Sequence, residues 1–577
     1  MSLPNSGKNS DIVSLAMRSV RPALSAAIVF SFFINLLALS APLYMLQIYD
    51  RVLSSRSIPT LLLLTLLLAF LYAVSASLET IRSKVLVRAG VAFDRDANPD
   101  VFRAVQRATI QSPSPRHSQA LRDLDSIREF YTGQGLIAFF DFLWVPLFLA
   151  AAFLLHPIYG YMAVGAAVFS FCLTVLNERL TRPILDKATR DAQLANNNAL
   201  TTFRNAEVLQ AMGMVESLRA RWSNFHEGML GWQAVASNRA GVVLALSRFN
   251  RLLMQSIVLG VGAYLVIERQ VTPGTMIAAS IIVGKALAPV EIALAQWKSF
   301  TNMRGARGRI SEMLKALPEK EKRLSLPAPK GDISFEGVIA RAPGQSKPVL
   351  SNISLKIAAG TTLGIIGPSA AGKSSMLRVL LGVWPILSGN IRIDGSEINH
   401  WDPDELGPYI GYLPQDVELF SGTIAENISR FQDDFRMEDV LTAARLAGVH
   451  EMIQALPEGY NTVIGDRGQG LSGGQRQRLG LARAMFGMPP VIVLDEPNAN
   501  LDQAGEAALT QAIQQMKNSG STVILVTHKT NILALVDQIA IINNGQIQAS
   551  GPAEQVLAKL ANANNVAPIS TKTISAA

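Results

Sequence analysis

The stretch Gly367-Pro368-Ser369-Ala370-Ala371-Gly372-Lys373-Ser374-Ser375 contains the GxxxxGK[ST] spacing of a P-loop. Its glycines let backbone N–H groups wrap a phosphate, while Lys373 reaches the terminal phosphates and Ser374 can bind Mg²⁺. The apolar run 362–366 before it predicts a buried strand, and residues 375–381 after it predict a helix. The stretch therefore predicts an α/β domain that binds a nucleoside triphosphate with Mg²⁺.

The first half of the chain has a different character. The 577 residues are too many for one ordinary domain, and 49% are apolar while only 17% are charged. Six apolar segments each approach the roughly 20 residues that cross a hydrocarbon core of about 30 Å. They lie at about 22–44, 59–78, 136–155, 157–176, 250–267 and 273–291. Burial inside a soluble protein is the alternative, but the first two segments are too long and too free of charge for it.

The connections between these segments alternate in length. Those around 47–58, 156–157 and 268–272 are short, whereas 79–135 and 177–249 are long, polar and arginine-rich. A positive-inside bias places the long loops and both termini in the cytoplasm. We expect the long loops to be helical extensions of the spans. Within them, the apolar spacing of 119–130 predicts a short helix that docks on another element.

Charge and cysteine content exclude several function classes. The net charge of +8 is explained by arginines such as Arg82, Arg88 and Arg103 between the spans, so nucleic-acid binding is not favoured. Cys172 is the single cysteine, which excludes an intrachain disulfide and argues against a cysteine protease. Residues 1–20 lack the apolar core of a signal peptide.

Composition also predicts the domain boundaries. We expect an N-terminal tail over 1–20, a transmembrane domain over 21–310 and a proline-containing linker over 311–331. A nucleotide-binding domain over 332–560 and a disordered tail over 561–577 complete the chain.

Two further motifs follow the P-loop. Leu471-Ser472-Gly473-Gly474-Gln475 lies about a hundred residues downstream. The run 491–497 has a buried strand that ends in Asp495 and Glu496, as in a Walker B motif. There Asp495 would hold Mg²⁺ through water and Glu496 would polarise the attacking water.

With these motifs the chain resembles ABC transporters of the exporter type, from about residue 21 to 555. The resemblance implies a six-helix membrane domain of the type-1 exporter fold followed by a P-loop ATPase domain. It also implies that Gln415 is the Q-loop glutamine that senses Mg²⁺, Asp502 the D-loop aspartate and His528 the histidine that contacts the γ-phosphate. The segments 119–130 and 202–212 would be coupling helices that contact the ATPase domain.

The family's mode of assembly implies a head-to-tail homodimer. ATP on residues 367–375 of one chain would be capped by residues 471–475 of the other. A heterodimer with a degenerate partner remains the alternative. One departure from the family concerns the base: Ala342 stands where an adenine-stacking tyrosine is usual, so we expect weaker base selectivity or an aromatic residue donated from elsewhere.

Three segments of the membrane half resemble the ATPases of bacterial type I secretion systems, in the branch that exports metalloproteases and RTX proteins (PrtD-type). They are 41–52, which includes Tyr49-Asp50-Arg51, and 140–146 and 284–291. The resemblance implies a polypeptide substrate with an uncleaved C-terminal signal, a periplasmic adaptor and an outer-membrane channel. Because the first span begins near residue 22, we expect no N-terminal peptidase domain. Exporters or flippases of lipids or small molecules are the alternative, and a soluble ABC ATPase is argued against by the six spans.

Three ionisable residues fall within the expected spans: Asp141, Lys285 and Glu291. Such residues are costly in hydrocarbon and usually face a cavity or a partner. They are predicted to line or gate a translocation path; the alternative is that Asp141 and Lys285 pair between helices.

Overall fold

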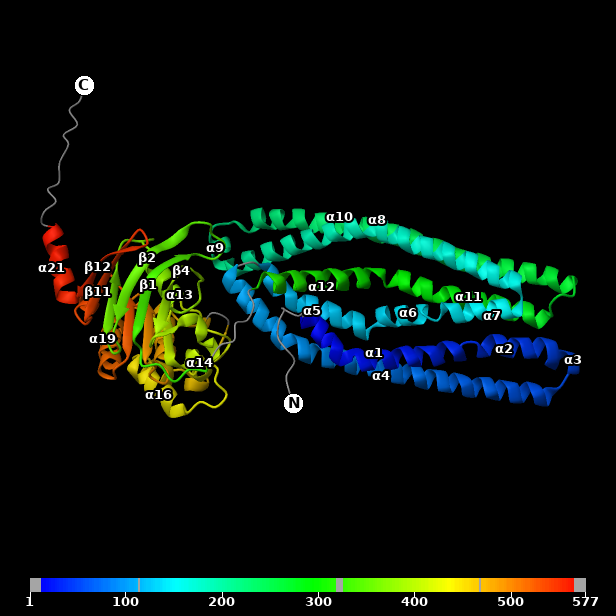
Figure 1. The fold of residues 1–577 in the computed structure, drawn as a ribbon, viewed down its shortest axis with the longest axis horizontal. Coiled ribbons are helices and arrows are strands. Elements are labelled where there is room, and N and C mark those ends of the chain that lie inside the picture. The colour runs from blue at the N-terminus through cyan, green and yellow to red at the C-terminus, as the bar shows by residue number, and fades with distance from the viewer. Residues whose placement is uncertain (1–11, 113–114, 318–324, 466–467, 565–577) are drawn as a thin grey trace, which may run out of the picture. The chain divides into compact units, whose positions relative to one another are not determined.

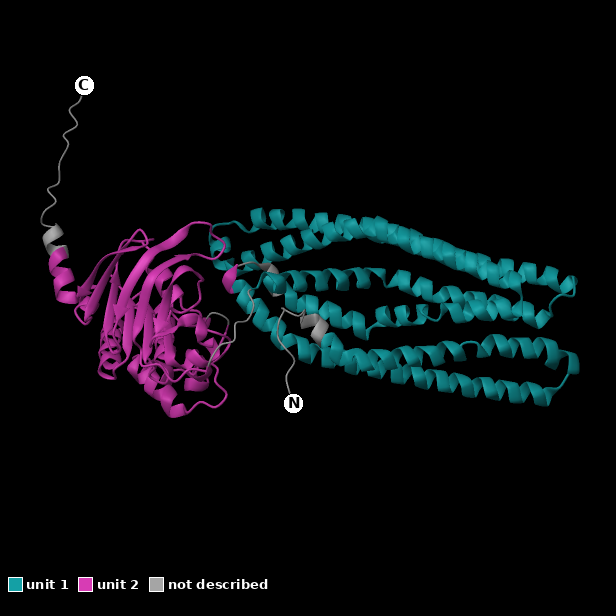
Figure 2. Cartoon of the chain, in the orientation of Figure 1, with its two compact units in different colours: residues 1–109, 114–319 teal, residues 110–113, 320–577 magenta. Residues whose placement is uncertain are grey.

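The computed structural model describes residues 12–112, 115–317, 325–465 and 468–564. The chain divides into two compact units, which we call the helical unit (1–109 and 114–319) and the sheet unit (110–113 and 320–577), shown in Figures 1 and 2. Most of the predicted N-terminal and C-terminal tails, and residues 318–324 of the predicted linker, lie outside the described residues.

The described part of the helical unit consists of helices joined by short turns (Figure 1). They are α1 (Ile12–Leu37), α2 (Ser40–Gln47), the π-helix η1 (Ile48–Val52), α3 (Leu53–Ser55), α4 (Ile58–Gln111), α5 (Pro115–Thr132), α6 (Gln134–Phe142), α7 (Val145–Leu155), α8 (Pro157–Arg204), α9 (Ala206–Ala211), α10 (Val215–Ile267), α11 (Pro273–Ala295) and α12 (Trp297–Ala316). The helices α4, α8 and α10 have 54, 48 and 53 residues, so the long loops are helical extensions of the spans, as predicted.

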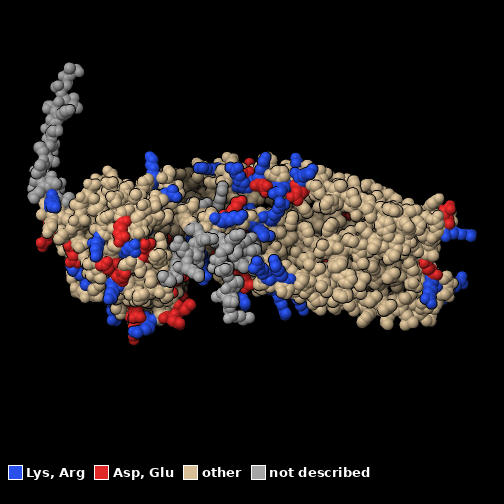
Figure 3. Space-filling view, in the orientation of Figure 1, with Lys and Arg blue, Asp and Glu red and all other residues tan. Residues whose placement is uncertain are grey.

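Six runs of helix in the described residues are long and apolar enough to cross a membrane, which confirms the six-helix prediction. The most apolar window of α4 is not buried at all, whereas that of α11 is 67% buried. The α4 helix therefore presents its leucines outward and α11 lies at the centre of the bundle. In Figure 3 charged side chains gather at the two ends of the helical unit and leave a broad uncharged band between them, as a lipid-facing surface requires.

The predicted docking helix is α5, and its apolar face packs within the helical unit. Leu124 and Ile127 of α5 are buried in one cluster with Ile310 of α12. Beside them Arg309 of α12 donates two hydrogen bonds to Asp123, at 2.7 and 2.8 Å. The apolar face of α5 is thus occupied by α12.

We expect the Asp123–Arg309 pair to be a measurable contributor to stability. The Asp123 side chain is 4% exposed, so Arg309→Leu leaves a buried carboxylate without its partner, which costs roughly 3 kcal/mol. Thermal unfolding in detergent should show a lower midpoint for this variant and near-recovery in Asp123→Leu/Arg309→Met. The matched control is Arg219→Leu, because its partner Glu216 is 75% exposed and a surface pair contributes little. Equal shifts in the two single variants would contradict the expectation.

The short helix α9 lies in the other predicted coupling segment, between α8 and α10. Leu209 of α9 is buried, while Val208 is 53% and Met212 is 69% exposed. This segment therefore presents apolar side chains on its surface.

The sheet unit alternates strands with helices. The strands are β1 (Ile333–Arg341), β2 (Pro348–Ile357), β3 (Thr362–Ile366), β4 (Ile386–Ile393), β5 (Ser396–Glu397), β6 (Ile410–Leu413), β7 (Gly422–Thr423), β8 (Val463–Ile464), β9 (Val491–Asp495), β10 (Thr522–Val526), β11 (Gln538–Asn543) and β12 (Gln546–Pro552). The helices are α13 (Lys373–Leu380), α14 (Pro403–Leu406), α15 (Ile424–Ile428), α16 (Met437–Leu446), α17 (His450–Gln454), α18 (Gly473–Met485), α19 (Gln503–Asn518), α20 (Thr530–Leu533) and α21 (Ala553–Asn564).

The central sheet has the order β12-β11-β3-β10-β9-β6, and only the β11–β12 pair in it is antiparallel. All five residues of β9 and of β10 are buried, as their continuous apolar runs predict for strands covered on both faces. A second, antiparallel sheet has the order β2-β1-β4-β5.

Candidate functional site

Three parallel strands bring the predicted catalytic segments to one edge of the central sheet. Val526 of β10 lies beside Ile365 of β3 and beside Asp495 of β9. The P-loop follows β3, Glu496 follows β9 and His528 comes two residues after β10. Because the carboxyl ends of parallel strands meet at the same edge, a phosphate-binding loop and two acidic residues lie together there.

The P-loop conformation depends on its glycines. A Cβ added at Gly367 would lie 2.0 Å from the carbonyl oxygen of Ile542, and Gly372 has a φ of +104°. The α13 helix begins at Lys373, which is buried and whose Nζ donates to the carbonyl oxygens of Gly367 and Pro368 at 2.8 and 2.9 Å. A positive charge therefore lies within the loop at the N-terminus of a helix, an arrangement that binds anionic phosphates.

Ser374 and Asp495 join the P-loop helix to the end of β9. The Ser374 hydroxyl donates to Asp495 Oδ1 at 3.0 Å. Asp495 is fully buried, and burial raises the pKa of its carboxyl while the hydrogen bond from Ser374 lowers it. Within the described residues Asp495 Oδ2 is buried and has no hydrogen-bond partner. A hydroxyl beside an unsatisfied carboxylate oxygen fits the oxygen ligands that Mg²⁺ and its water require.

Gln415 and Glu496 meet at the same edge. Gln415 Nε2 donates to Glu496 Oε2 at 3.2 Å, and the backbone N–H of Glu496 donates to the carbonyl of Val526 at 3.1 Å. Glu496 has a φ of +50°, an uncommon conformation for a residue other than glycine and one that concentrates at functional sites. The sheet thus fixes the backbone of Glu496 while its carboxylate contacts Gln415. His528 is exposed.

The stretch 471–475 forms the N-terminus of α18. Ser472 is its N-cap: Gln475 N–H donates to Ser472 Oγ at 3.2 Å, and Ser472 N–H donates to Gln475 Oε1 at 2.8 Å. A Cβ added at Gly474 would lie 2.8 Å from the carbonyl oxygen of Asn500, so the segment before α19 packs directly on this turn. Asp502 caps α19 by accepting from Gly505 N–H at 2.8 Å. Ser472 is exposed and its helix turn is held rigid.

Sequence reasoning missed Arg378. It lies four residues after Ser374, hence on the same face of α13, and stacks on Trp384 with 5.2 Å between the guanidinium carbon and the ring centroid. Burial raises the pKa of Tyr412 of β6 and of Asp495, and the nearby charge of Arg378 opposes both shifts. The four-residue spacing from Ser374 was the signal that could have identified it.

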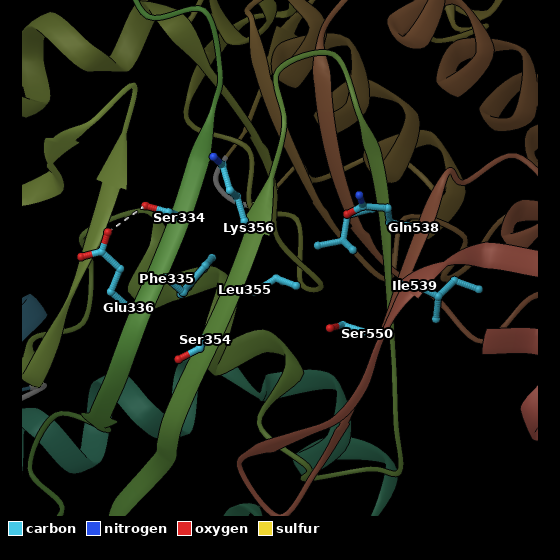
Figure 4. Close-up of a pocket in the computed structure, with 11 residues that line it drawn as sticks. Ser334, Phe335, Glu336, Ser354, Leu355, Lys356, Gln538, Ile539 and Ser550 are labelled. Atoms are coloured by element: carbon cyan, nitrogen blue, oxygen red, sulfur yellow. Dashed lines mark hydrogen bonds between the residues drawn. The ribbon is translucent and has the colours of Figure 1, made fainter. Parts of the chain in front are cut away.

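Ala342 lies in the turn after β1, where Gln345 N–H donates to its carbonyl oxygen at 3.1 Å. Elsewhere in the sheet unit a groove of ≈ 530 Å³ lies between β1–β2 and β11–β12, and Figure 4 shows its lining. Its polar lining includes Glu336, Lys356 and Gln538. P-loop residues are not among those that line it, so this groove is distinct from the phosphate-binding edge.

In the helical unit the structure corrects one of the two alternatives for Asp141. Asp141 of α6 accepts hydrogen bonds from Arg82 of α4 at 2.9 Å and from Asn35 of α1 at 3.1 Å. Arg82 also donates to Ser31 at 2.7 Å and is buried. The proposed pairing of Asp141 with Lys285 is therefore wrong, because the ion-pair partner of Asp141 is Arg82, which donates to its Oδ1. Arg82 belongs to this buried polar cluster rather than to a solvent-exposed loop.

Glu291 and Lys285 both lie on α11 but differ in environment. Glu291 accepts from Arg251 Nε of α10 at 2.8 Å, so it is paired across two helices. Lys285 is exposed on a helix whose neighbouring residues are mostly buried. The three ionisable residues are thus not brought together by one contact.

Known proteins are similar to this chain in sequence and in fold. The family model "ABC transporter" matches residues 350–499, and "ABC transporter transmembrane region" matches residues 24–286. The type I secretion system ATP-binding protein PrsD of Rhizobium meliloti (strain 1021) is 43% identical over 555 residues, which cover 96% of this chain and 95% of that protein. The leukotoxin translocation ATP-binding protein LktB of Bibersteinia trehalosi is 31% identical over 554 residues, 94% of this chain and 77% of that protein.

The fold agrees with a solved structure. A bacterial Atm1-family ABC exporter with ATP bound superposes with a TM-score of 0.80 at 21% identity, covering 95% of this chain and 100% of that one. The predicted architecture, a six-helix membrane domain followed by a P-loop ATPase domain, is confirmed. The chain therefore belongs to the ABC transporter family, among the type I secretion system ATP-binding proteins, and is an ATPase coupled to membrane transport.

Proposed function

We propose that this multi-pass inner-membrane protein is the exporter of a type I secretion system and uses ATP to move a polypeptide with an uncleaved C-terminal signal. The observation that carries the proposal is the similarity, over nearly the full length of both chains, to a type I secretion ATP-binding protein. The name of the second relative, a leukotoxin translocation protein, supports a polypeptide as the transported molecule.

At the ATP site, residues 367–375, which include Lys373, bind the phosphates, and Glu496 orients the attacking water. The hydrogen bond from Gln415 supports this role, since it holds the Glu496 carboxylate next to the P-loop edge. His528 contacts the γ-phosphate. Ser374, Asp495 and Gln415 would hold Mg²⁺, which neutralises charge that develops on the phosphate oxygens. The unpartnered Asp495 Oδ2 supports this donor set.

Two chains complete each site. The N-terminus of α18, with residues 471–475, caps the ATP that is bound to the P-loop of a second copy, and Asp502 supports this contact from the D-loop. The exposed Ser472 at the start of a 13-residue helix favours this role, because helix N-termini bind anions. Since Glu496 and the capping stretch are both intact in this chain, a homodimer has two hydrolysing sites.

The topology follows from charge. The long basic extensions of α4, α8 and α10, the ATPase domain and both termini are cytoplasmic. The short connections 47–58, 156–157 and 268–272 then lie on the periplasmic side.

The exposed apolar residues near α9, Val208 and Met212, make this segment the better of the two candidate coupling helices. On the periplasmic side the dimer works with an adaptor and an outer-membrane channel. The lipid bilayer covers the membrane-spanning part of α4. Lys285, exposed on the mostly buried α11, lines the translocation path, whereas Asp141 and Glu291 hold neighbouring helices through their arginine partners.

An export assay tests this function. A strain that lacks the chain should lose one or more extracellular polypeptides, and the wild-type chain should restore them. The Lys373→Ala variant should be present in membranes and restore none. An unchanged extracellular fraction in all strains would refute the proposal.

A further inference from the structure

One segment singled out in the sequence, Tyr49-Asp50-Arg51, has no part in the ATP site. It lies in η1, a five-residue π-helix between α2 and α3 at the short-connection end of the bundle. Single π-turns are rare and frequently occur at functional sites. Tyr49 and Arg51 are exposed, whereas Asp50 is turned toward the N-terminus of α11.

Both carboxylate oxygens of Asp50 are engaged by the start of α11. Asp50 Oδ1 accepts from the backbone N–H of Gly274 at 2.8 Å, and Asp50 Oδ2 accepts from the hydroxyl of Thr272. Thr272 is itself the N-cap of α11, since its hydroxyl accepts from Thr275 N–H at 3.2 Å. The carboxylate therefore adds a full negative charge to the positive end of a 23-residue helix.

Glycine at 274 is required by this contact. A Cβ there would lie 2.5 Å from Asp50 Oδ1 and 2.7 Å from the carbonyl oxygen of Leu46. The backbones of the α2–η1 segment and of α11 are thus in close contact, although Asp50 and Gly274 are 224 residues apart in the chain.

The contact of Asp50 with Thr272 and Gly274 joins the first two spans to the sixth. Asp50 belongs to the hairpin of the first two spans, which is held internally by a hydrogen bond of 2.8 Å between Tyr44 and Thr65. Thr272 and Gly274 begin the sixth span. The Thr272 hydroxyl contact is exposed, so water can replace it when the groups separate. A charged contact that is exposed on one side can open and close, unlike the buried Arg82–Asp141 cluster.

We propose that Asp50 is the latch of a gate at the short-connection end of the bundle. The gate is closed when the Asp50 carboxylate caps the N-terminus of α11. It opens, with the first hairpin moving away from the sixth span, when the polypeptide leaves; this step rests on the proposed function. Asp50 is a positioning residue that acts through α11 and does not bind ATP.

A reversible crosslink tests the latch in the full-length dimer. Because Cys172 is the single cysteine, Cys172→Ser provides a cysteine-free background into which Asp50→Cys and Thr272→Cys are placed. Oxidation, or a short bis-thiosulfonate reagent, should lower polypeptide export to about a tenth or less and leave measurable ATPase activity, and reduction should restore export. The matched control joins Tyr44→Cys to Thr65→Cys within the hairpin with the bis-thiosulfonate reagent, because the Tyr44 contact is made by the far end of its side chain, and should leave export unchanged. Undiminished export from protein that is almost completely crosslinked at 50–272 would overturn the proposal.

A second readout does not depend on export. A membrane-impermeant maleimide should label Thr272→Cys severalfold faster in Asp50→Ala than in Asp50→Asn, because asparagine keeps an acceptor for Gly274 N–H, which alanine lacks. Glu268→Ala, an exposed change in the same connection, should label at the parent rate. Equal labelling rates in the Asp50→Ala, Asp50→Asn and Glu268→Ala variants would contradict the latch. If the wild-type chain exports no polypeptide while the labelling order holds, the proposed function fails and the latch stands.

Discussion

Replacing Glu496 by glutamine is expected to lower kcat for ATP hydrolysis by about 100-fold or more, with little change in ATP affinity. Positioning and polarising a water contributes on the order of 10²–10⁴ to such a reaction, and the amide cannot accept the proton. The substitution preserves shape, and the amide can still hydrogen-bond to Gln415, which contacts this position at 3.2 Å. Binding should survive, since the P-loop and Lys373 are unchanged. ATPase rates and nucleotide affinity of the purified dimer measure both quantities.

The control for this variant is Glu458→Gln, an exposed glutamate of the same unit. It should hydrolyse ATP at the wild-type rate. If the Glu496→Gln protein retains kcat within about threefold of wild type, the water-orienting role of Glu496 is wrong. A large rise in KM with an unchanged kcat would instead assign Glu496 to binding.

The second large effect is expected at Ser472, and it should act across the dimer. Ser472→Arg places a bulky cation where the cap for the partner's ATP is proposed, so a homodimer of this variant should lose at least about 95% of its ATPase activity, a loss of about 2 kcal/mol in transition-state stabilisation. Loss of the N-cap alone costs about 1 kcal/mol of stability, which does not prevent folding. Thr423→Ala measures that effect separately, because Thr423 and Glu426 form the same capping box at α15.

Mixed dimers separate the two chains of each site. A dimer of one Ser472→Arg chain and one Lys373→Ala chain contains one site with an intact P-loop and an intact cap, and one site that lacks both. Co-expression with two affinity tags should yield dimers with clearly more activity than either homodimer. Activity no higher than that of the two variants alone would contradict sharing of sites between chains.

Local patterns in the sequence predicted much of the site. The P-loop, the strand that ends at Asp495 and the buried run before His528 each depend on a few neighbouring residues, and parallel strands bring their carboxyl ends to one edge. The six spans were predictable for the same reason, since length and apolar character are local properties.

Contacts between distant elements were not predictable in the same way. Lys285 was considered as the partner of Asp141, but the partner is Arg82. Sequence alone does not give the rotation of a helix or the identity of its neighbours. The bidentate Asp123–Arg309 contact spans 186 residues and was likewise missed. The antiparallel sheet β2-β1-β4-β5 depends on register between strands separated along the chain, which alternating apolar residues alone do not fix.

In the proposed function, ATP hydrolysis on this chain drives a polypeptide through a secretion complex. Affinity purification of the full-length Glu496→Gln protein from native membranes, with ATP and Mg²⁺ present, tests it most directly. We expect a periplasmic adaptor, an outer-membrane channel and a secreted polypeptide to co-purify, and the Lys373→Ala protein to recover them less well. Recovery of lipid or a small molecule with none of these proteins would contradict the proposed function.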